Sequence, residues 1–408
     1  MTLSVAPGAT PIVFYIKATN SEGLTAKTQV NVHGLSYSFG TTEVEGETQV
    51  TASSLYTETL GYGFESTTGL TDATTNVAGT AAYKFKANVP NGNYKVTVNT
   101  TSASMTSEIV EGLPNETAVI GTTKSGNEFN VAVCDGVLDL TFAANSNITS
   151  LSIAQIARPE EREKPKIYAI GDSTTQNSDS GNLSWGSYTA SNSSVVPSAF
   201  SSFSNNGKSG ADSESFYTSR LIENILLDIH PGDYVTVNMG INYNRVGTNE
   251  AGAYPTLMDT YYVKAIMDRG GIPVITTSTP IGYNADPNKG WTEGADGTIT
   301  CNRGTAARNG ELRKLAVKYN LNIIELSYYC ENYFNNVITD ADVTTYNAAN
   351  GTSYATKIEM LRSWWGDHNH YKEPVAKIIS AYMLNCLEQI ENGSTAFNQA
   401  NDPHISEQ

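Results

Sequence analysis

The sequence predicts a parallel α/β domain preceded by an all-β sandwich. Two observations lead to this prediction. Up to about residue 157, apolar residues alternate in short runs separated by turn residues, as in β-strands. After residue 166, short apolar runs alternate with segments of helical periodicity, which indicates a parallel sheet flanked by helices. A chain of 408 residues is long enough for two or three domains.

The first part of the chain has the pattern of strands and tight turns. Residues 12–32 look like two alternating strands joined at residues 21–23, which predicts a hairpin. Residues 83–99 alternate on both sides of a Pro-Asn-Gly-Asn turn, and residues 130–142 repeat this pattern around an Asp-Gly pair, so we interpret both as hairpins. The expected architecture is a sandwich or jelly roll over residues 36–157.

The second part begins after a segment that breaks both patterns. Residues 158–165 contain two prolines and six charged residues, which indicates a linker. We expect strands at 166–170, 233–239, 272–280 and 321–329. We expect helices around 222–229, 312–319 and 375–390, the last with Pro374 near its start. In such sheets, ligands bind at the carboxyl ends of the strands.

Composition and charge exclude several classes of function. The net charge of −16 argues against nucleic-acid binding, which needs a basic face. No apolar run of about 18 residues is present, so no membrane span is expected. The four cysteines are too widely spaced for a zinc motif; isolated buried thiols are favoured, and a Cys301–Cys330 pair is left open. We expect an exported bacterial protein, extracellular or at the cell surface, whose signal peptide is missing from this sequence.

The segment "AIGDSTTQ", residues 169–176, places a serine just after a predicted strand. Gly, Asp and Ser are all turn formers, so Ser173 can be a plain turn residue. It can also be a nucleophile, which requires a base, a group that orients the base, and donors for an oxyanion. Of the five histidines, His368 and His370 in "WWGDHNHYKEP" are the candidates for the base, with Asp367 to orient His370.

Two other interpretations of these residues stay open. Zinc binding by Asp367, His368 and His370 would need further ligands, and none is evident. Asp367 also lies a few residues before a predicted helix, where it can act as a cap.

"IYAIGDST" and "DHNH" resemble the first and last motif blocks of the SGNH (GDSL) hydrolase superfamily. This resemblance implies a three-layer α/β/α, flavodoxin-like catalytic domain and an acyl-transfer mechanism without metal or other cofactor. Carried over by position, it makes Ser173 the nucleophile, Asp367 the orienting carboxylate and His370 the base.

The two middle blocks of the superfamily match less closely. "MGINYN" resembles the third block and makes Asn242 an oxyanion donor, although Tyr243 replaces the usual aspartate and Asn244 competes for the role. "GADSESF" resembles the second block of rhamnogalacturonan acetylesterases and makes the backbone N–H of Gly210 a donor beside that of Ser173. Gly207 is the alternative to Gly210.

The second block also departs from the rhamnogalacturonan acetylesterase block that it resembles. Ala211 and Glu214 stand where rhamnogalacturonan acetylesterases have arginines.

The resemblance implies a serine esterase that removes O-acetyl groups from a plant cell-wall polysaccharide, with pectic rhamnogalacturonan as the expected substrate. The alternatives are an acetylxylan or other hemicellulose esterase, a lipid or thioester hydrolase, and a non-catalytic glycan-binding protein. The expected substrate contacts are Trp364 and Trp365, which can stack on a sugar, together with Asp172 and Arg308.

The whole chain is expected to consist of five segments. The β part resembles a galactose-binding, carbohydrate-binding-module-like sandwich, and further modules of a longer chain are open. The predicted segments are a hairpin (1–35), a sandwich (36–157), a linker (158–165), a catalytic domain (166–395) and a polar tail (396–408).

Overall fold

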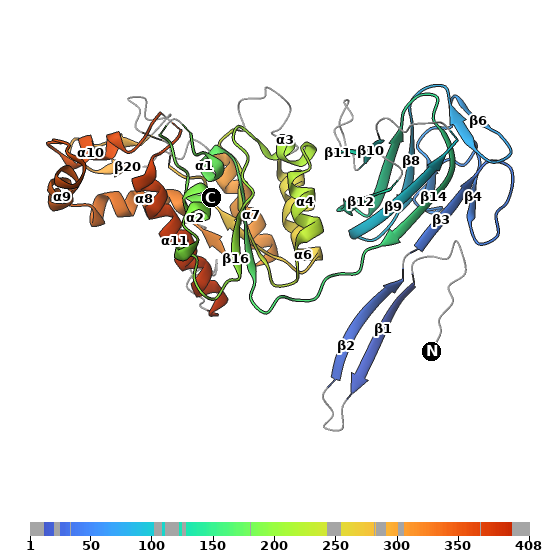
Figure 1. Ribbon diagram of the computed structural model, residues 1–408, viewed down its shortest axis with the longest axis horizontal. Helices are drawn as coiled ribbons and strands as arrows, with labels where there is room; N and C mark the ends of the chain where they lie inside the picture. Colours follow the sequence, from blue (N-terminus) through green and yellow to red (C-terminus); the bar gives the residue numbers. More distant parts are fainter. Residues whose placement is uncertain are drawn as a thin grey trace. The chain divides into compact units, whose positions relative to one another are not determined.

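The computed structural model shows two units (Figure 1). It describes residues 12–19, 25–32, 34–101, 108–110, 122–124, 128–179, 181–242, 254–280, 282, 291–300, 306–367 and 369–393. The first unit contains residues 1–158 and 217–228, and the second contains 159–216 and 229–408. Residues 217–228 group with the first unit, whereas the sequence placed them inside the 166–395 segment. Within the first unit, the Asn93 side chain donates to the Leu226 carbonyl at 2.8 Å.

The N-terminal strands form the predicted hairpin pairing. Strand β1 (Ile12–Thr19) pairs antiparallel with β2 (Thr25–Val32), with Thr19 opposite Thr25. They form a two-stranded sheet of their own among the described strands.

The rest of the first unit is built from two sheets, whose strand orders are β11-β10-β13-β8-β5 and β12-β9-β14-β3-β4. Their strands are β3 (Gly34–Phe39), β4 (Thr48–Val50), β5 (Tyr62–Phe64), β8 (Tyr83–Asn88), β9 (Gly92–Thr100), β10 (Glu108–Val110), β11 (Thr122–Lys124), β12 (Glu128–Val133), β13 (Val137–Phe142) and β14 (Asn147–Gln155). Two short strands, β6 (Leu70–Asp72) and β7 (Val77–Gly79), pair beside β14. The predicted β-rich region is therefore present.

The interpretation of residues 83–99 and 130–142 as hairpins is wrong. Strand β8 pairs with β13 in one sheet, while β9 pairs with β12 in the other. Each predicted turn therefore carries the chain from one sheet to the other. Both arrangements produce the same alternation, because one face of every strand is buried in either case. The partner of a strand is thus not readable from its own pattern.

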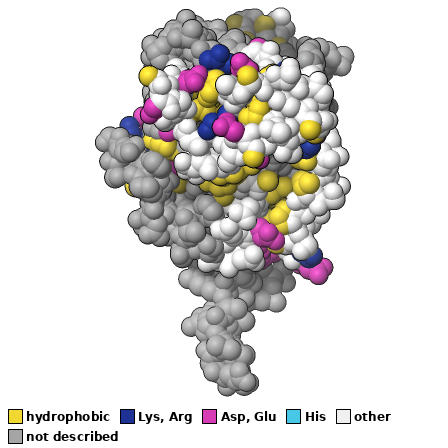
Figure 2. Space-filling model, turned by 90° about the vertical axis from the view of Figure 1, so that its left-hand side faces the viewer, with side chains coloured by type: hydrophobic (Ala, Val, Ile, Leu, Met, Phe, Trp, Pro, Cys, Tyr) yellow, Lys and Arg dark blue, Asp and Glu magenta, His cyan; other side chains and the backbone are white. Residues whose placement is uncertain are grey.

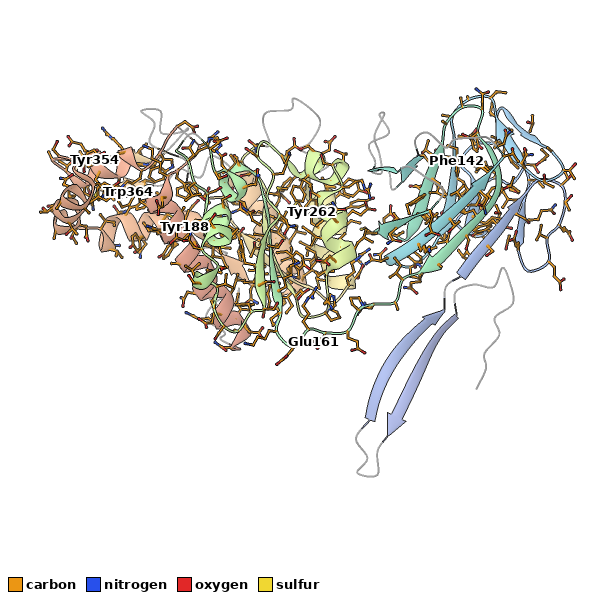
Figure 3. All side chains as sticks on the ribbon, in the orientation of Figure 1. Phe142, Glu161, Tyr188, Tyr262, Tyr354 and Trp364 are labelled. Atoms are coloured by element: carbon orange, nitrogen blue, oxygen red, sulfur yellow. The ribbon has the colours of Figure 1, made fainter. Side chains whose placement is uncertain are left out.

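Aromatic side chains fill the core of this unit. Phe85 has no exposed surface and packs edge-to-face against Phe39 and Phe64, with ring centroids 5.5 and 5.6 Å apart. Phe142, labelled in Figure 3, stacks on Tyr83 at 5.4 Å. Burying one such ring contributes on the order of 2–3 kcal/mol.

The second unit is built on a five-stranded parallel sheet with the order β16-β15-β17-β18-β21. Its strands are β15 (Lys166–Gly171), β16 (Ser202–Asn205), β17 (Tyr234–Asn238), β18 (Ile272–Thr276) and β21 (Ile323–Ile324). In chain order this is 2-1-3-4-5, the doubly wound order of flavodoxin-like sheets. The predicted α/β fold with a β-rich region before it is confirmed.

Helices cover both faces of this sheet. On one face, α2 (Trp185–Ser191) packs on the long C-terminal helix α11 (Glu373–Glu391), which begins with Pro374 at its first turn as predicted. On the other face, α6 (Ala265–Asp268) and α7 (Ala306–Tyr319) pack against β18.

The chain after residue 172 contains further helical and strand segments. They are α1 (Ser173–Gln176), η1 (Ser193–Val195), α3 (Ser213–Thr218), α4 (Leu221–Asp228), η2 (Leu257–Lys264), β19 (Thr292–Glu293), β20 (Ile299–Thr300), α8 (Leu326–Asn332), η3 (Tyr333–Val337), α9 (Asp340–Asn350) and α10 (Lys357–Ser363).

One strand of the sheet was not predicted. Strand β16 has the polar sequence Ser-Phe-Ser-Asn and lies at the edge of the sheet, paired only with β15 among the described strands. An edge strand can keep one side in solvent, so it does not need the continuous apolar run that marks the central strands.

Charged side chains are mixed on the surface of the second unit. The face in Figure 2 carries acidic and basic side chains next to one another, with apolar and uncharged groups between them. Arg362 Nη2 and Glu293 Oε2, 3.5 Å apart, are one such pair in this unit. Within the described part of the chain, no helix has both the length and the apolar character needed to cross a bilayer.

Cys134, Cys330 and Cys386 are all buried. Cys330 is a free thiol, and Cys301, its possible partner, lies outside the described residues. Burial raises the pKa of Cys386 to about 12, so this thiol stays protonated and unreactive at neutral pH.

In the first unit, burial disfavours the ionised form of the Asp139 carboxyl group. Asp139 on β13 is 8% exposed and lies opposite Lys86 on β8, with Oδ1 3.6 Å from Nζ. Burial raises the pKa of Asp139 to about 6, although Lys86 and Lys84 act in the opposite direction. The folded state therefore binds a proton that the unfolded chain has already released.

This shift predicts how the stability of the first unit depends on pH. Because the unfolded pKa is about 4 and the folded pKa about 6, the free energy of unfolding should fall as the pH rises from about 4 to 6, by on the order of 2 kcal/mol. Asp139→Asn should remove this slope in urea titrations of the wild type and variant. Glu128→Gln, in an exposed pair with Lys95, should leave it unchanged. Equal slopes in the wild type and Asp139→Asn would contradict the assignment.

Candidate active site

Ser173 stands where strand β15 turns into helix α1. The strand ends at Gly171, and a Cβ there would lie 2.1 Å from Thr175 Oγ1, so only glycine fits. Asp172 is the N-cap of α1: its Oδ1 accepts from the Thr174 N–H at 2.9 Å and from the Thr174 hydroxyl at 2.8 Å. Ser173 is the first helical residue and is 5% exposed.

The loop before α11 brings a carboxylate and an imidazole together. Trp365 and Tyr371 pair as an isolated antiparallel bridge, so the residues between them form a closed loop. Asp367 Oδ1 accepts from the backbone N–H groups of Asn369 and His370 at 2.7 and 2.8 Å. Its other oxygen, Oδ2, lies 2.8 Å from Nδ1 of His370.

These two segments meet at the serine. His370 Nε2 lies 2.9 Å from Ser173 Oγ. A carboxylate can only accept, so Asp367 fixes the neutral imidazole with its proton on Nδ1. Nε2 then accepts from the Ser173 hydroxyl. This arrangement can activate a serine for nucleophilic attack.

Electrostatics keep the carboxylate of Asp367 ionised. Partial burial by itself would raise its pKa, but the His370 imidazole and the N–H groups of Asn369 and His370 together hold the pKa below its usual value. The side chain of His370 is only 20% exposed, so its ring is held between Asp367 and Ser173.

The two segments expected to supply oxyanion donors, at Asn242 and Gly210, contact each other. The Asn242 side chain is 3% exposed, and its Nδ2 donates to the carbonyl of Ala211, the residue after Gly210, at 3.0 Å. An amide nitrogen has two hydrogens, so a second donor remains. Within the described part of the chain, nothing accepts from the N–H of Gly210, whereas the N–H of Gly207 is bonded to Asn205 Oδ1 at 3.1 Å.

This difference favours Gly210 over Gly207 as the backbone donor. Gly210 has a φ of +78°, which suits glycine. Tyr243 and Asn244 lie outside the described residues, so the competition between Asn244 and Asn242 stays open.

Hydrogen bonds at the start of α3 fix the loop that carries Gly210. The Ser215 N–H donates to Asp212 Oδ1 at 2.7 Å and the Asp212 N–H donates to Ser215 Oγ at 2.9 Å, which is a reciprocal cap of α3. Tyr262, a buried tyrosine labelled in Figure 3, donates its hydroxyl to the Ser213 carbonyl at 2.6 Å. Sequence reasoning did not find Tyr262, since a tyrosine in a helical segment reads as core.

The structure does not place the expected substrate contacts as predicted. Trp364 and Trp365 are 5% and 7% exposed, so in this structure neither presents a ring face on which a sugar can stack. Trp365 packs against Trp291 and Phe334, and Trp364, labelled in Figure 3, packs against Tyr346. Their position just before Asp367 reflects the core beneath the loop.

Asp172 is also buried rather than available to a substrate. It has no exposed surface, and its carboxylate caps α1. Burial raises the pKa of Asp172, although the Thr174 donors and the Ile241 N–H oppose this effect. Its observed contacts position the serine turn. The side chain of Arg308, like that of His368, lies outside the described part of the structure.

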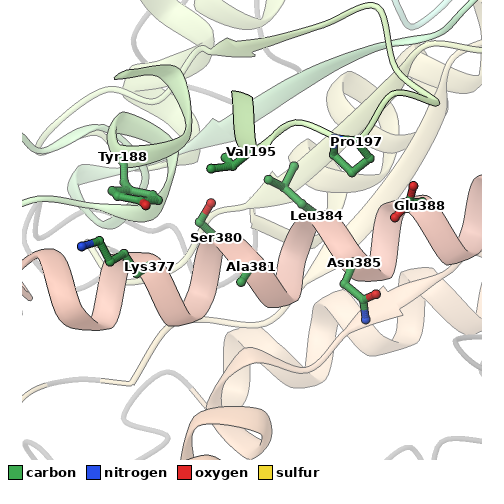
Figure 4. Close-up of a pocket in the computed structure, with 9 residues that line it drawn as sticks. All are labelled: Tyr188, Val195, Pro197, Lys377, Ser380, Ala381, Leu384, Asn385 and Glu388. Carbon is green, nitrogen blue, oxygen red and sulfur yellow. The ribbon is translucent and has the colours of Figure 1, made fainter. Parts of the chain in front are cut away.

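Within the described residues, no group of three or more potential ligands is gathered around a possible metal position. A groove of about 440 Å³ lies along α11 and α2 (Figure 4). Its buried hydroxyl, Ser380 Oγ, is already bonded to Thr189 Oγ1 at 2.7 Å. This groove is not lined by Ser173, Asp367 or His370.

Helix α1 depends on close packing against α2. A Cβ on Gly186 would lie 2.4 Å from the Thr175 carbonyl of α1, which cannot move without moving the serine turn. The Asn205 side chain donates to the same carbonyl at 3.1 Å. The glycine in α2 is therefore required by contact, although alanine is the better helix former.

Gly186→Ala should for this reason lower the stability of the second unit by about 1–3 kcal/mol and displace Ser173. Gly310→Ala is the matched control, because a Cβ at this position in α7 meets nothing within 4 Å and should be neutral or stabilising. Thermal unfolding and the labelling rate of Ser173 by a fluorophosphonate measure the two effects. Unchanged values for Gly186→Ala would show that α1 and α2 are not in this contact.

Comparison with known proteins gives one relative by sequence. No family model matches the chain. The uncharacterized esterase YxiM of Bacillus subtilis is 27% identical over 278 residues, which cover 61% of this chain and 70% of that protein. The crystal structure of YxiM aligns with 88% of this chain and 99% of its own, at 19% identity and a TM-score of 0.41. An acetyl xylan esterase, AlAXEase, aligns with 54% of this chain and 99% of its own, at 15% identity and a TM-score of 0.35.

Proposed function

We propose that this chain is a serine esterase of the SGNH superfamily that removes O-acetyl groups from a plant cell-wall polysaccharide. The observation that carries the proposal is the chain of contacts from Asp367 Oδ2 to His370 Nδ1, at 2.8 Å, and from His370 Nε2 to Ser173 Oγ, at 2.9 Å. The esterase name of the relative YxiM supports the reaction type. Pectic rhamnogalacturonan is the proposed substrate, on the resemblance of residues 210–216 to the second motif block of rhamnogalacturonan acetylesterases.

The proposed reaction runs through an acyl-enzyme. His370 Nε2 takes the hydroxyl proton as Ser173 Oγ attacks the acetyl carbonyl, and Asp367 stabilises the imidazolium. The oxyanion accepts from the backbone N–H groups of Ser173 and Gly210 and from the second hydrogen of the Asn242 amide. His370 returns the proton to the departing sugar oxygen, which leaves as a free hydroxyl group. His370 then deprotonates a water molecule, whose oxygen attacks the acyl carbonyl; acetate is released and the proton returns to Ser173 Oγ.

The surroundings of the serine suit a polar substrate. The segment 205–209, which ends just before Gly210, contains two Asn and one Ser, and Lys208 and Ser209 in it are exposed. A long acyl chain would need an apolar groove instead. The charge of −16 does not prevent a polysaccharide with uronate groups from approaching, since exposed charges are screened within about 8 Å at physiological salt.

Ser173→Ala should abolish acetate release from acetylated rhamnogalacturonan, by at least about 10³-fold, because no other group can form the acyl-enzyme. Ser201→Ala is the control, since its exposed hydroxyl bonds only the Pro165 carbonyl among the described groups. Acetylated xylan and a long-chain ester are assayed in parallel with both variants. Release from xylan alone would move the substrate to hemicellulose. Undiminished release by Ser173→Ala would refute the mechanism.

Asn242→Ala should lower kcat by about 10²–10³-fold with little change in KM, because the amide contacts the oxyanion only after attack. Asn385→Ala, an exposed asparagine of α11, is the matched control. Steady-state kinetics on 4-nitrophenyl acetate separate the two constants. A rise in KM at constant kcat would instead assign Asn242 to substrate binding.

A further inference from the structure

The bond between Ser173 and His370 joins two distant parts of the chain. Ser173 belongs to the turn after β15, and His370 follows it by 197 residues in the loop before α11. Nothing in the triad itself ties the loop to α1 except the 2.9 Å contact between Nε2 and Oγ. A shift of about 1 Å in such a contact can cost on the order of 10²-fold in rate. Another group must therefore fix the distance.

Tyr371, the residue directly after His370, bridges the two segments. Its hydroxyl donates to the carbonyl of Thr174, the residue directly after Ser173, at 2.6 Å. The same hydroxyl accepts from the backbone N–H of Trp185 at 3.3 Å. Its own carbonyl accepts from the Leu183 N–H at 3.0 Å. The side chain and backbone carbonyl of this one residue thus contact α1, α2 and the segment between them.

The two backbone groups that meet this hydroxyl belong to helix ends. Thr174 lies in the four-residue helix α1, whose last carbonyls accept no N–H group of the helix itself. Trp185 is the first residue of α2, whose N-cap Ser184 makes no side-chain capping bond. A tyrosine hydroxyl has one hydrogen to donate and lone pairs to accept, so it satisfies both groups at once.

Burial makes this contact rigid. Tyr371 is 1% exposed, and Thr174 and Trp185 are 1% and 0% exposed. Burial raises the pKa of Tyr371 well above its ordinary value, so the hydroxyl keeps its proton. Removing the hydroxyl leaves a carbonyl and an N–H without this partner in an interior that excludes water, which is costly for both.

We infer that Tyr371 is a positioning residue for the proposed esterase reaction: it sets the distance between His370 and Ser173 by fastening the base-bearing loop to helix α1 and to the start of α2. The inference rests on the proposed function for the reaction that it serves. Its physical basis is a second connection, one residue beyond each partner of the catalytic contact.

The test compares Tyr371→Phe with Tyr234→Phe. Both variants lose one buried hydroxyl and keep the ring, but Tyr234 donates to Glu391 Oε2, at 2.8 Å, at the start of β17, away from the carboxyl ends of the strands. For Tyr371→Phe we expect kcat on 4-nitrophenyl acetate to fall by about tenfold or more, with KM within about twofold of the wild type. Labelling of Ser173 by a fluorophosphonate should slow by a similar factor. Tyr234→Phe should keep both rates.

A second variant separates positioning from general stability. Replacement of Tyr371 by 4-aminophenylalanine keeps a donor at the same place and should restore most of kcat. Wild-type kcat and labelling in Tyr371→Phe would overturn the inference. So would a folded 4-aminophenylalanine variant with strongly reduced kcat, which also decides the question if Tyr371→Phe does not fold. A wild-type protein that neither hydrolyses esters nor labels at Ser173 would instead refute the proposed function.

Discussion

The contact between Ser173 Oγ and His370 Nε2 is the constraint on which the second unit depends. It requires that a turn after the first strand of the sheet and a loop before the last helix meet to within 2.9 Å. The parallel sheet makes this possible, because strands that run in one direction place all their following loops at one edge. Gly171 lets the serine turn approach β17, and the pairing of Trp365 with Tyr371 closes the opposing loop.

The supporting contacts form layers around this bond. Asp172 and Gly186 fix helix α1 from within and from α2, and Asp367 fixes the imidazole. Asp172 and Gly186 are buried, and both carboxylates accept from backbone N–H groups. A site built in this way loses little conformational entropy when a substrate binds, since its side chains are already ordered.

The fold of the second unit was predictable because its signals are local. Alternating apolar strands and helical stripes determine a parallel sheet, and the order of the elements then determines where the loops gather. Ser173, Asp367 and His370 could be named because each stands in a short motif at such a loop. Strand β16 was missed because an edge strand of sequence Ser-Phe-Ser-Asn needs no apolar run.

The errors in the sequence reading have a common physical cause. Whether β8 pairs with β9 or with β13 is decided by residues far along the chain, and the alternation of β8 is the same in both cases. Trp364 and Trp365 were assigned to a sugar because they precede Asp367, yet the side chains beneath the loop bury them. Asp172 has a carboxyl side chain but lies at a helix start, where this group caps the backbone. Sequence position shows proximity along the chain but not the direction of a side chain.

The distance in sequence between Ser173 and His370 has a consequence for the newly made protein. During synthesis the chain grows from its N-terminus, so β15 and the serine leave the ribosome long before the loop and α11 follow. Until that C-terminal segment has docked, the serine has no base and remains an ordinary alcohol. If Ser173 is the nucleophile that we propose, its reactivity arises only after the C-terminal segment has docked. The incomplete chain then carries an unactivated serine.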